Sequence, residues 1–327
     1  MKMLGSRWFS VSIFSGILGC ALLIFPSVAN AQWQATAGAQ SEDMGRQALA
    51  FLPNEFWIHA GDNITWTWKA DDIHTVTFLA SGQPRPDFTV GCPGFSPSGS
   101  SVTPSTCVTS PPMVTGATFN VVFPVAGNFK LVCLVHVDMT ATIHVLDPSE
   151  PLPHDQAFYN SQAAIERRAL LSDTDQGHAH ARENSSPNSV TVGIGETVAT
   201  GGGHQNASVM RFLEPQTFIQ VGGTVEWTNH DPMAGHTITF GVEPANPLPP
   251  SSNVTMDPDG TLHATISSTS DNINSGDIHS APQERLGLPP LLGPTRFRVT
   301  FTKPGTYPYR CLFHDNLGMK GVIIVLP

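Results

Sequence analysis

One pattern occurs twice in the chain, and this internal repeat is the strongest constraint on its fold. The first copy opens at Phe51 with FLPNEFWIHAGDNITWTWKADDIHTVTF, and the second opens at Phe212 with FLEPQTFIQVGGTVEWTNHDPMAGHTITF. Both alternate apolar and polar residues, turn at a glycine and then reach His-Thr-x-Thr-Phe, as successive strands joined by tight turns do. The repeat therefore indicates two units of one fold.

The two copies also end alike, at Leu146 and Leu326. Their closing segments are FNVVFPVAGNFKLVCLVHVDMTATIHVL and FRVTFTKPGTYPYRCLFHDNLGMKGVIIVL. Each segment predicts a strand, a glycine turn, a strand, a short loop and a final strand. Short strands and glycine turns without βαβ alternation favour an antiparallel sandwich in each half. Because 327 residues suffice for two domains of ordinary size, we expect an all-β protein of two sandwich domains.

The N-terminal segment has the features of a signal peptide. Two cations precede an apolar run over 8–28, and Ala29-Asn30-Ala31 fits the small-x-small cleavage pattern. Two alternatives are a retained membrane anchor, since the run approaches the length of a spanning helix, and lipid attachment at Cys20. We expect cleavage of 1–31 and export to the periplasm or the cell exterior, with no membrane span in the mature chain.

The charge of the mature chain limits its partners. Removing the leader takes two cations and no acidic residue, which leaves 14 Lys and Arg against 26 Asp and Glu. A net charge of about −12 makes nucleic acid an unsuitable partner. It favours encounter partners that carry a basic patch.

The mature chain divides into a first domain at 32–147, a linker at 148–189 and a second domain at 190–327. The linker is polar and punctuated by proline, apart from QAFYNSQAAIERRALL, which could form a short amphipathic helix. The second domain also carries a Pro/Ser/Asn-rich excursion over 243–294, and insertions of this kind belong on surfaces.

Four cysteines stay in the mature chain and fall into two kinds. Cys92 and Cys107 flank a Gly/Pro/Ser-rich stretch with little apolar content, so we expect a disulfide between them in an oxidising compartment. Closing such a loop contributes roughly 3 kcal/mol on the chain-entropy model. Cys133 and Cys311 lie one in each half, and their surroundings favour a different role from pairing with each other.

Each half combines a distant histidine with a tight Cys, His and Met cluster. The first set has the spacing C-x2-H-x2-M after its histidine, and the second has C-x2-H-x4-M. The sets are His74, Cys133, His136 and Met139, and His236, Cys311, His314 and Met319. Two imidazoles, a thiolate and a weak axial thioether form the trigonal blue-copper set, which holds both Cu(I) and Cu(II). A short loop between two strands can present three of these ligands while the fourth comes from a neighbouring strand.

These motifs resemble the cupredoxin family, and the resemblance covers nearly the whole mature chain. CLFHDNLGM in the second half is similar to the plastocyanin or pseudoazurin loop, and CLVHVDM in the first half has the shorter amicyanin spacing. The resemblance implies Greek-key β-sandwiches, a type 1 copper at each set, and a bacterial periplasmic protein. It also implies that His136 and His314 lie nearest the surface as ports for electrons, which family members mostly shuttle between larger redox proteins.

Copper enzymes are one alternative to an electron carrier. Two cupredoxin domains in one chain also describe copper nitrite reductases and small laccases, which typically have a histidine directly before the ligand cysteine. Val132 and Arg310 stand at those positions, and no H-C-H occurs. We therefore expect a carrier rather than an enzyme. A second alternative is copper buffering or delivery, and a binding module with a vestigial site is disfavoured because neither set lacks a ligand.

The remaining histidines and tryptophans have simpler interpretations. His230 lies near His236 and could compete as a ligand, but only His236 aligns with His74 in the repeat. His178 and His180 form an H-x-H in the polar linker, where a weak exposed metal site is the alternative to a solvated segment. The other histidines lack a repeated context and are expected to have surface or structural roles. We expect core packing for the strand tryptophans Trp66, Trp68 and Trp227.

Overall fold

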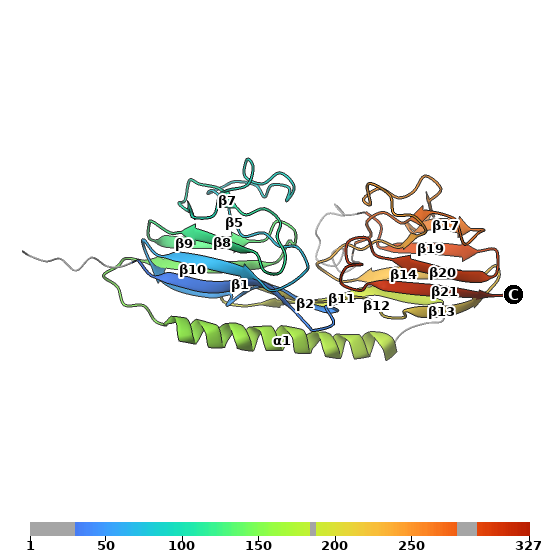
Figure 1. The fold of residues 1–327 in the computed structure, drawn as a ribbon, viewed down its shortest axis with the longest axis horizontal. Helices are drawn as coiled ribbons and strands as arrows, with labels where there is room; N and C mark the ends of the chain where they lie inside the picture. Colours follow the sequence, from blue (N-terminus) through green and yellow to red (C-terminus); the bar gives the residue numbers. More distant parts are fainter. Residues whose placement is uncertain (1–29, 184–187, 280–292) are drawn as a thin grey trace, which may run out of the picture.

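The computed structural model describes residues 30–183, 188–279 and 293–327, with the backbone alone for 173–183. Strands dominate, and they form two halves that lie side by side with a long helix beneath both (Figure 1). The predicted signal peptide falls almost wholly on 1–29, outside the described residues. Within the described part, no helix combines the length and the apolar character needed to cross a membrane.

The first half precedes the helix, and its described residues form ten strands. They are β1 (Gln32–Gln40), β2 (Arg46–Leu52), β3 (Glu55–His59), β4 (Asn63–Trp68), β5 (Thr77–Phe78), β6 (Ser100–Ser101), β7 (Val108–Thr109), β8 (Thr118–Val122), β9 (Gly127–Val132) and β10 (Thr140–Leu146).

The helix α1 (Gln156–Glu183) leads into the second half. Its strands are β11 (Ser189–Ala199), β12 (His204–Phe212), β13 (Gln216–Gln220), β14 (Thr224–His230), β15 (Thr239–Phe240), β16 (Thr255–Met256), β17 (Leu262–Ile266), β18 (Ile273–Asn274), β19 (Arg296–Phe301), β20 (Gly305–Arg310) and β21 (Lys320–Leu326).

Each half is a two-layer sandwich, as the repeat predicts. The small sheets have matching orders, β3-β10-β9-β5-β7 and β13-β21-β20-β15-β18. Each packs on its own part of a larger sheet, and buried apolar side chains fill the space between the layers. Trp66, Trp68 and Trp227 lie in these cores with at most 1% exposure, which confirms their packing role.

The sandwiches are not purely antiparallel, and here the expectation from sequence was too simple. Strand β1 runs parallel to β4, and β10 runs parallel to β3. The same parallel pairs recur in the second half between β11 and β14 and between β13 and β21. They arise because the chain crosses from one sheet to the other between successive strands, so a strand can return beside an earlier one in the same direction.

A continuous sheet joins the two halves. Strands β2 and β12 pair antiparallel, with Ala48 opposite Ala207, so the large sheet contains 11 strands in the order β16-β17-β19-β14-β11-β12-β2-β1-β4-β8-β6. The backbone hydrogen bonds of this pair lie inside the molecule, where broken bonds would leave polar groups without water. The two halves are therefore joined by buried main-chain hydrogen bonds of the same kind as those between the strands within each half.

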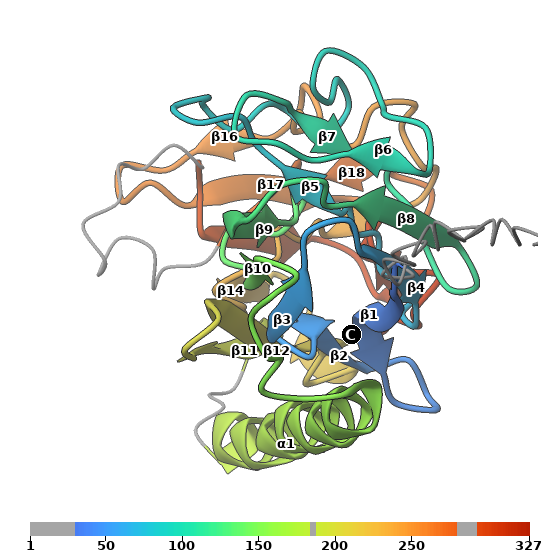
Figure 2. The same cartoon turned by 90° about the vertical axis from the view of Figure 1, so that its left-hand side faces the viewer.

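Helix α1 crosses this junction on the outer face of the large sheet (Figure 2). Asp155 caps its N-terminus, because Asp155 Oδ1 accepts a hydrogen bond of 2.9 Å from the Phe158 N–H. Leu170 lies in one buried cluster with Ala48 and Ala207, and these small side chains let the helix approach the sheet. The sequence predicted the beginning of this helix, but it placed only 156–171 in it because polar residues follow Leu171.

The glutamate in the middle of α1 connects the two halves directly. Glu166 Oε2 accepts hydrogen bonds from the Asn54 N–H at 3.0 Å and from Gln205 Nε2 at 2.8 Å. Asn54 also bonds to the Thr200 hydroxyl. The segment predicted as a linker with a short helix thus contains a long helix that braces the two halves.

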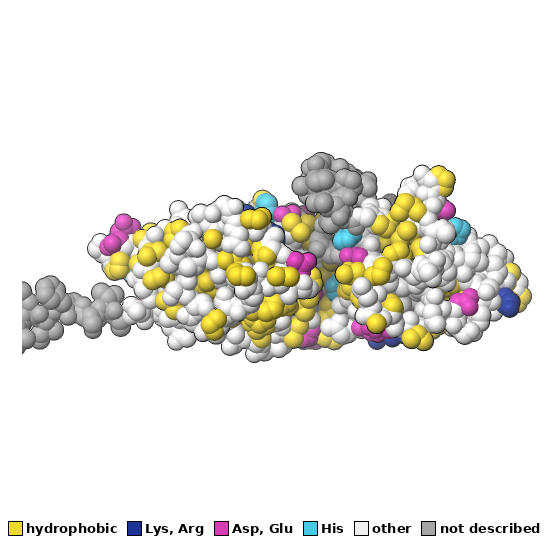
Figure 3. Space-filling view, turned by 90° about the horizontal axis from the view of Figure 1, so that it is seen from above, with side chains coloured by type: hydrophobic (Ala, Val, Ile, Leu, Met, Phe, Trp, Pro, Cys, Tyr) yellow, Lys and Arg dark blue, Asp and Glu magenta, His cyan; other side chains and the backbone are white. Residues whose placement is uncertain are grey.

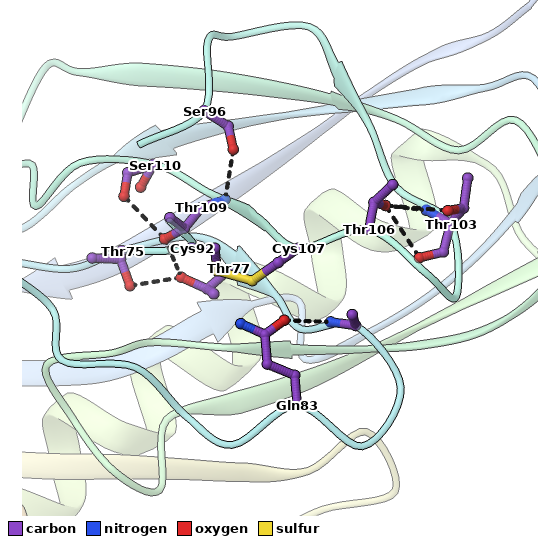
Figure 4. The surroundings of a disulfide bond; sticks show 11 residues. Thr75, Thr77, Gln83, Cys92, Ser96, Thr103, Thr106, Cys107, Thr109 and Ser110 are labelled. Carbon is purple, nitrogen blue, oxygen red and sulfur yellow. Dashed lines mark hydrogen bonds between the residues drawn. A yellow bond between two sulfur atoms is a disulfide. The ribbon is translucent and has the colours of Figure 1, made fainter. Parts of the chain in front are cut away.

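Cys92 and Cys107 form the expected disulfide, which closes the long loop between β5 and β7 (Figure 4). A row of buried threonine hydroxyls lies beside it. Thr77 Oγ1 lies 2.7 Å from Thr109 Oγ1 and 3.0 Å from Thr75 Oγ1. The loop is therefore tied to the strand that follows His74.

Truncating Leu170 tests the bracing role of α1. Leu170 is 3% exposed, so Leu170→Ala should lower the free energy of unfolding by about 2–5 kcal/mol. Ile165 lies on the same helix and is 62% exposed, so Ile165→Ala should change it by less than about 0.5 kcal/mol. Urea denaturation followed by circular dichroism measures both. Equal unfolding midpoints for the two variants would contradict the brace.

Candidate metal centres

The first ligand set comes from one end of the first sandwich. His74 lies between β4 and β5, and Cys133, His136 and Met139 occupy the loop between β9 and β10. Two backbone hydrogen bonds of 3.0 Å fix His74 to Met113, and the Cys133 N–H donates to the Met139 carbonyl at 3.0 Å. The loop is thus closed upon itself, and His74, Cys133 and Met139 are completely buried.

The second set repeats this arrangement. His236 lies between β14 and β15, and the loop between β20 and β21 carries Cys311, His314 and Met319. The His236 N–H donates to the Ile278 carbonyl at 3.0 Å, and the Cys311 N–H donates to the Met319 carbonyl at 3.1 Å. The loop with four residues between its histidine and its methionine therefore closes like the shorter one.

In each centre the two imidazoles and the thiol converge on one point. The Nδ1 atoms of His74 and His136 lie 3.1 Å apart, and those of His236 and His314 also lie 3.1 Å apart. The sulfur atom of Cys133 is 3.8 Å from His136 Nδ1, and that of Cys311 is 3.6 Å from His314 Nδ1. Among the described residues, these two groups are the ones that bring three metal-binding side chains together.

Met139 and Met319 are completely buried beside these groups. The Met139 N–H donates to the His136 carbonyl at 3.2 Å, and the Met319 N–H donates to the His314 carbonyl at 3.1 Å. A buried thioether next to two imidazoles and a thiolate completes the donor set of a type 1 copper site.

The electrostatics of both centres favour the thiolate that a metal requires. Burial alone would raise the pKa of the Cys311 thiol, but the adjacent His314 and His236 lower it to about 5. Burial likewise opposes ionisation of Cys133, and hydrogen bonds with His136 and His74 hold its pKa well below the usual range. Since a thiolate is the metal-binding form of cysteine, both thiols are prepared for binding.

One backbone N–H donates to each sulfur in the same way. The Thr75 N–H donates to Cys133 Sγ at 3.5 Å, and the Thr237 N–H donates to Cys311 Sγ at 3.4 Å. The hydroxyls of the same two threonines each accept a 2.8 Å bond from the residue after the cysteine. Hydrogen bonds around the sulfur tune the potential of such a site, and the sequence did not single out these threonines.

A glycine in a β-bulge packs against the upstream histidine of each centre. Register shifts place Gly38 in β1 and Gly193 in β11 at equivalent bulges, with φ of +69° and +59°. A Cβ atom at either glycine would lie 2.5 Å from Nε2 of His74 or His236. These glycines extend the repeat upstream of Phe51 and Phe212, beyond the part recognised in the sequence.

The two centres face each other across the junction. Leu317, from the second ligand loop, packs into the core of the first half. His136 and His314 are 3% and 5% exposed, and both approach the carboxylate of Asp72, at 3.3 Å and 4.0 Å. Both side chains are therefore almost fully buried, although each is the most exposed ligand of its centre, and their role as electron ports stays a prediction.

An aspartate beside one ligand histidine of each centre raises the pKa of that imidazole. Burial would lower the pKa of His136, but Asp72 outweighs it and raises that pKa to about 10. Asp231 has the same effect on His236, whose pKa is also raised to about 10 against the effect of burial. The sequence offered little sign of Asp72, because it has no counterpart at the same place in the second copy.

The other histidines lie outside the two groups. His230 ends β14 and is exposed, while His236 joins the second centre. Residues 178 and 180 belong to α1, and their side chains lie outside the described part. Most of the other histidines lie at or near the surface and contact an acidic or aromatic side chain. They are His144, His154, His204, His263 and His279.

Comparison with known proteins agrees with the geometry. Residues 197–326 match the family of copper binding proteins, plastocyanin/azurin. An oxidised plastocyanin from Dryopteris crassirhizoma is 19% identical over 42% of this chain and 99% of its own, with a TM-score of 0.22. A purple cupredoxin from Nitrosopumilus maritimus is 22% identical over 42% of this chain and 98% of its own, with a TM-score of 0.23.

A copper enzyme is also among the similar structures. A copper-containing nitrite reductase from Thermus scotoductus is 15% identical over 90% of this chain and 68% of its own, with a TM-score of 0.21. The similar structures thus include a copper enzyme as well as a plastocyanin.

The fold and the two centres define a copper-binding β-sandwich protein. Residues 197–326 match the plastocyanin/azurin family of copper binding proteins, and the structure shows two cupredoxin-like domains with a His-Cys-His group in each. Their buried donors, with a methionine beside each group, make them type 1 copper sites.

Adding a methyl group at Gly193 tests how closely the bulge supports the second centre. In Gly193→Ala the new Cβ would displace His236, so the second site should lose its copper while the first keeps it. Gly260 has a similar φ of +78° and no atom within 4 Å of its Cβ position, so Gly260→Ala carries the backbone strain of about 1–2 kcal/mol alone. The number of coppers bound per chain, measured in both variants, tests this expectation. Equal copper content would show that His236 tolerates the methyl group.

Proposed function

We propose that the protein is an exported electron carrier whose two type 1 copper sites cycle between Cu(II) and Cu(I). His74, Cys133, His136 and Met139 hold one copper, and His236, Cys311, His314 and Met319 hold the other. The observation that carries this proposal is the convergence of two imidazoles and a thiolate in each buried centre. When bound there, copper supplies a one-electron couple, and the protein supplies a donor set that suits both oxidation states.

The framework around each centre supports electron transfer over copper delivery. Backbone hydrogen bonds close both ligand loops, and all the cysteine, histidine and methionine donors are at most 5% exposed. A cage that is fixed and shielded from water changes little between oxidation states, which favours rapid electron exchange. A protein that hands over its copper needs ligands that an acceptor can reach, and these are covered.

Two observations also favour a carrier over a copper enzyme. A catalytic copper needs an open position for its substrate. Across the described residues, the metal-binding groups of this kind are the two buried centres. Val132 and Arg310 precede the two cysteines, where the enzymes of the family typically have a histidine.

The disulfide and the charge support the proposed location and partners. The Cys92–Cys107 disulfide fits an oxidising compartment, in agreement with export by the leader at 1–31. The face drawn in Figure 3 shows few Lys or Arg side chains. An acidic protein of this kind would meet redox partners through their basic surfaces.

Copper content and the visible spectrum test the proposed function directly. The purified mature protein should bind about two coppers per chain and show an intense thiolate-to-copper band at roughly 600 nm. Ascorbate should bleach the band, and air or ferricyanide should restore it. Copper without this band, or a band that does not return, would instead support copper handling.

Replacing one thiolate separates the two sites. Cys311→Ser should remove the blue band of the second site and about one copper per chain, because serine is a poor ligand for Cu(I). Cys133→Ser is the matched variant for the first site and should leave the second. Since the two ligand loops differ in length, the two bands and potentials should differ as well. Full absorbance in either variant would overturn the assignment of that cysteine.

A further inference from the structure

Asp72 lies between the two metal centres. It belongs to the loop that leads from β4 to His74 and is 5% exposed. One carboxylate oxygen, Oδ2, is 3.3 Å from Nε2 of His136. The other, Oδ1, is 4.0 Å from Nε2 of His314 and accepts a 2.8 Å hydrogen bond from the Ile73 N–H. A single carboxylate therefore approaches one ligand of each centre.

The two histidines present opposite ring atoms to the metal centres and to Asp72. Nδ1 of His136 lies 3.1 Å from His74 Nδ1, while its Nε2 points to the carboxylate. His314 has the same orientation, with Nδ1 3.1 Å from His236 Nδ1 and Nε2 toward Asp72. The two rings and the carboxylate thus form a row between the centres. The distances from the carboxylate to the His136 and His314 rings are 3.3 Å and 4.0 Å.

The junction keeps this row in place. The β2–β12 pairing, helix α1 and the contacts of Glu166 fix the two halves to each other. Arg211 Nη1 donates to the Leu317 carbonyl in the second ligand loop at 2.6 Å, and Arg211 Nη2 donates to the Asp43 carbonyl in the first half at 2.6 Å. The loop that carries His314 is therefore anchored on the half that carries Asp72.

The place of Asp72 in the row has no equivalent in the second half. Asp231 lies near the upstream ligand of its own centre, 3.8 Å from His236 Nε2, and it is completely buried. It also accepts hydrogen bonds from Ser208 Oγ and from the Met233 and Ala234 N–H groups. Asp231 thus supports one centre, whereas Asp72 contacts ligands of both.

We propose that Asp72 is a positioning residue that couples the two copper sites, so that electrons pass between them inside the chain through His136, Asp72 and His314. This inference rests on the proposed function. In the step, one electron leaves the Cys133 site, where Cu(I) becomes Cu(II), and arrives at the Cys311 site, where Cu(II) becomes Cu(I), or the reverse. No bond forms or breaks, and no further reactant is needed. The two sites therefore act as one redox unit.

The first test uses the unaltered protein, after its two blue bands have been established. A pulse of a one-electron reductant, supplied at less than one electron per chain, first reduces whichever site it reaches. A second phase should follow, in which absorbance moves from one blue band to the other at a rate independent of protein concentration. If electrons redistribute only at a rate that rises with protein concentration, the exchange is between molecules and the coupling is wrong. The proposed function stands in that case, because both blue bands are present.

The second test removes the charge of Asp72. Asp72→Asn is nearly isosteric, and loss of a negative charge beside both ligand sets should favour Cu(I) at both sites. The reduction equilibrium of each site should rise by about tenfold, which is about 59 mV for a one-electron couple, and the concentration-independent phase should slow. Redox titration of both bands measures the shifts.

Asp43→Asn is the matched control. Asp43 is 3.7 Å from Arg211 across the same junction, and its side chain is 70% exposed, so this variant removes one charge at the junction without touching either centre. It should leave both potentials and the intramolecular phase unchanged. A shift confined to the first site in Asp72→Asn, no shift at all, or equal shifts in Asp43→Asn would each overturn the role of Asp72.

Discussion

The antiparallel pairing of β2 with β12 is the interaction on which the rest of the structure depends. It turns two sandwiches into one body with a shared 11-stranded sheet, and its interior position makes separation of the halves costly. Helix α1 can lie across this sheet because Ala48 and Ala207 leave room for it. The orientation of the halves is therefore set by main-chain hydrogen bonds rather than by a flexible connection.

That orientation decides what each metal centre faces. In a single sandwich, the loop that carries Cys, His and Met would end at the solvent. Here the second ligand loop packs on the first half through Leu317, and His136 and His314 are covered. The identity of the ligands is thus a property of each half, while their accessibility is a property of the whole molecule. Intramolecular exchange of electrons follows naturally from centres arranged in this way.

The features within each half could be predicted from the sequence, whereas most contacts between the halves could not. The repeat, the ligand groups and the disulfide were all predictable because each depends on short-range patterns, such as alternation in a strand or spacing in a loop. The β2–β12 pairing and the role of Asp72 depend on contacts between residues far apart in the chain, and no periodicity reports them. The length of α1 was underestimated because the sheet beneath supports a helix whose C-terminal part is polar. The glycine bulges were missed because a lone glycine in a strand has several explanations.

The strands that meet at the junction are equivalent members of the repeat, since β2 and β12 occupy the same place in their halves. An antiparallel pair of equivalent strands has a local twofold axis, and the strand orders on either side of it mirror each other from β1 and β11 outward to β6 and β17. Homodimers have this twofold arrangement between two chains, and here it occurs within one chain. Because the two halves differ in sequence, the side chains at this axis need not be symmetric, and the single carboxylate of Asp72 approaches one ligand of each centre.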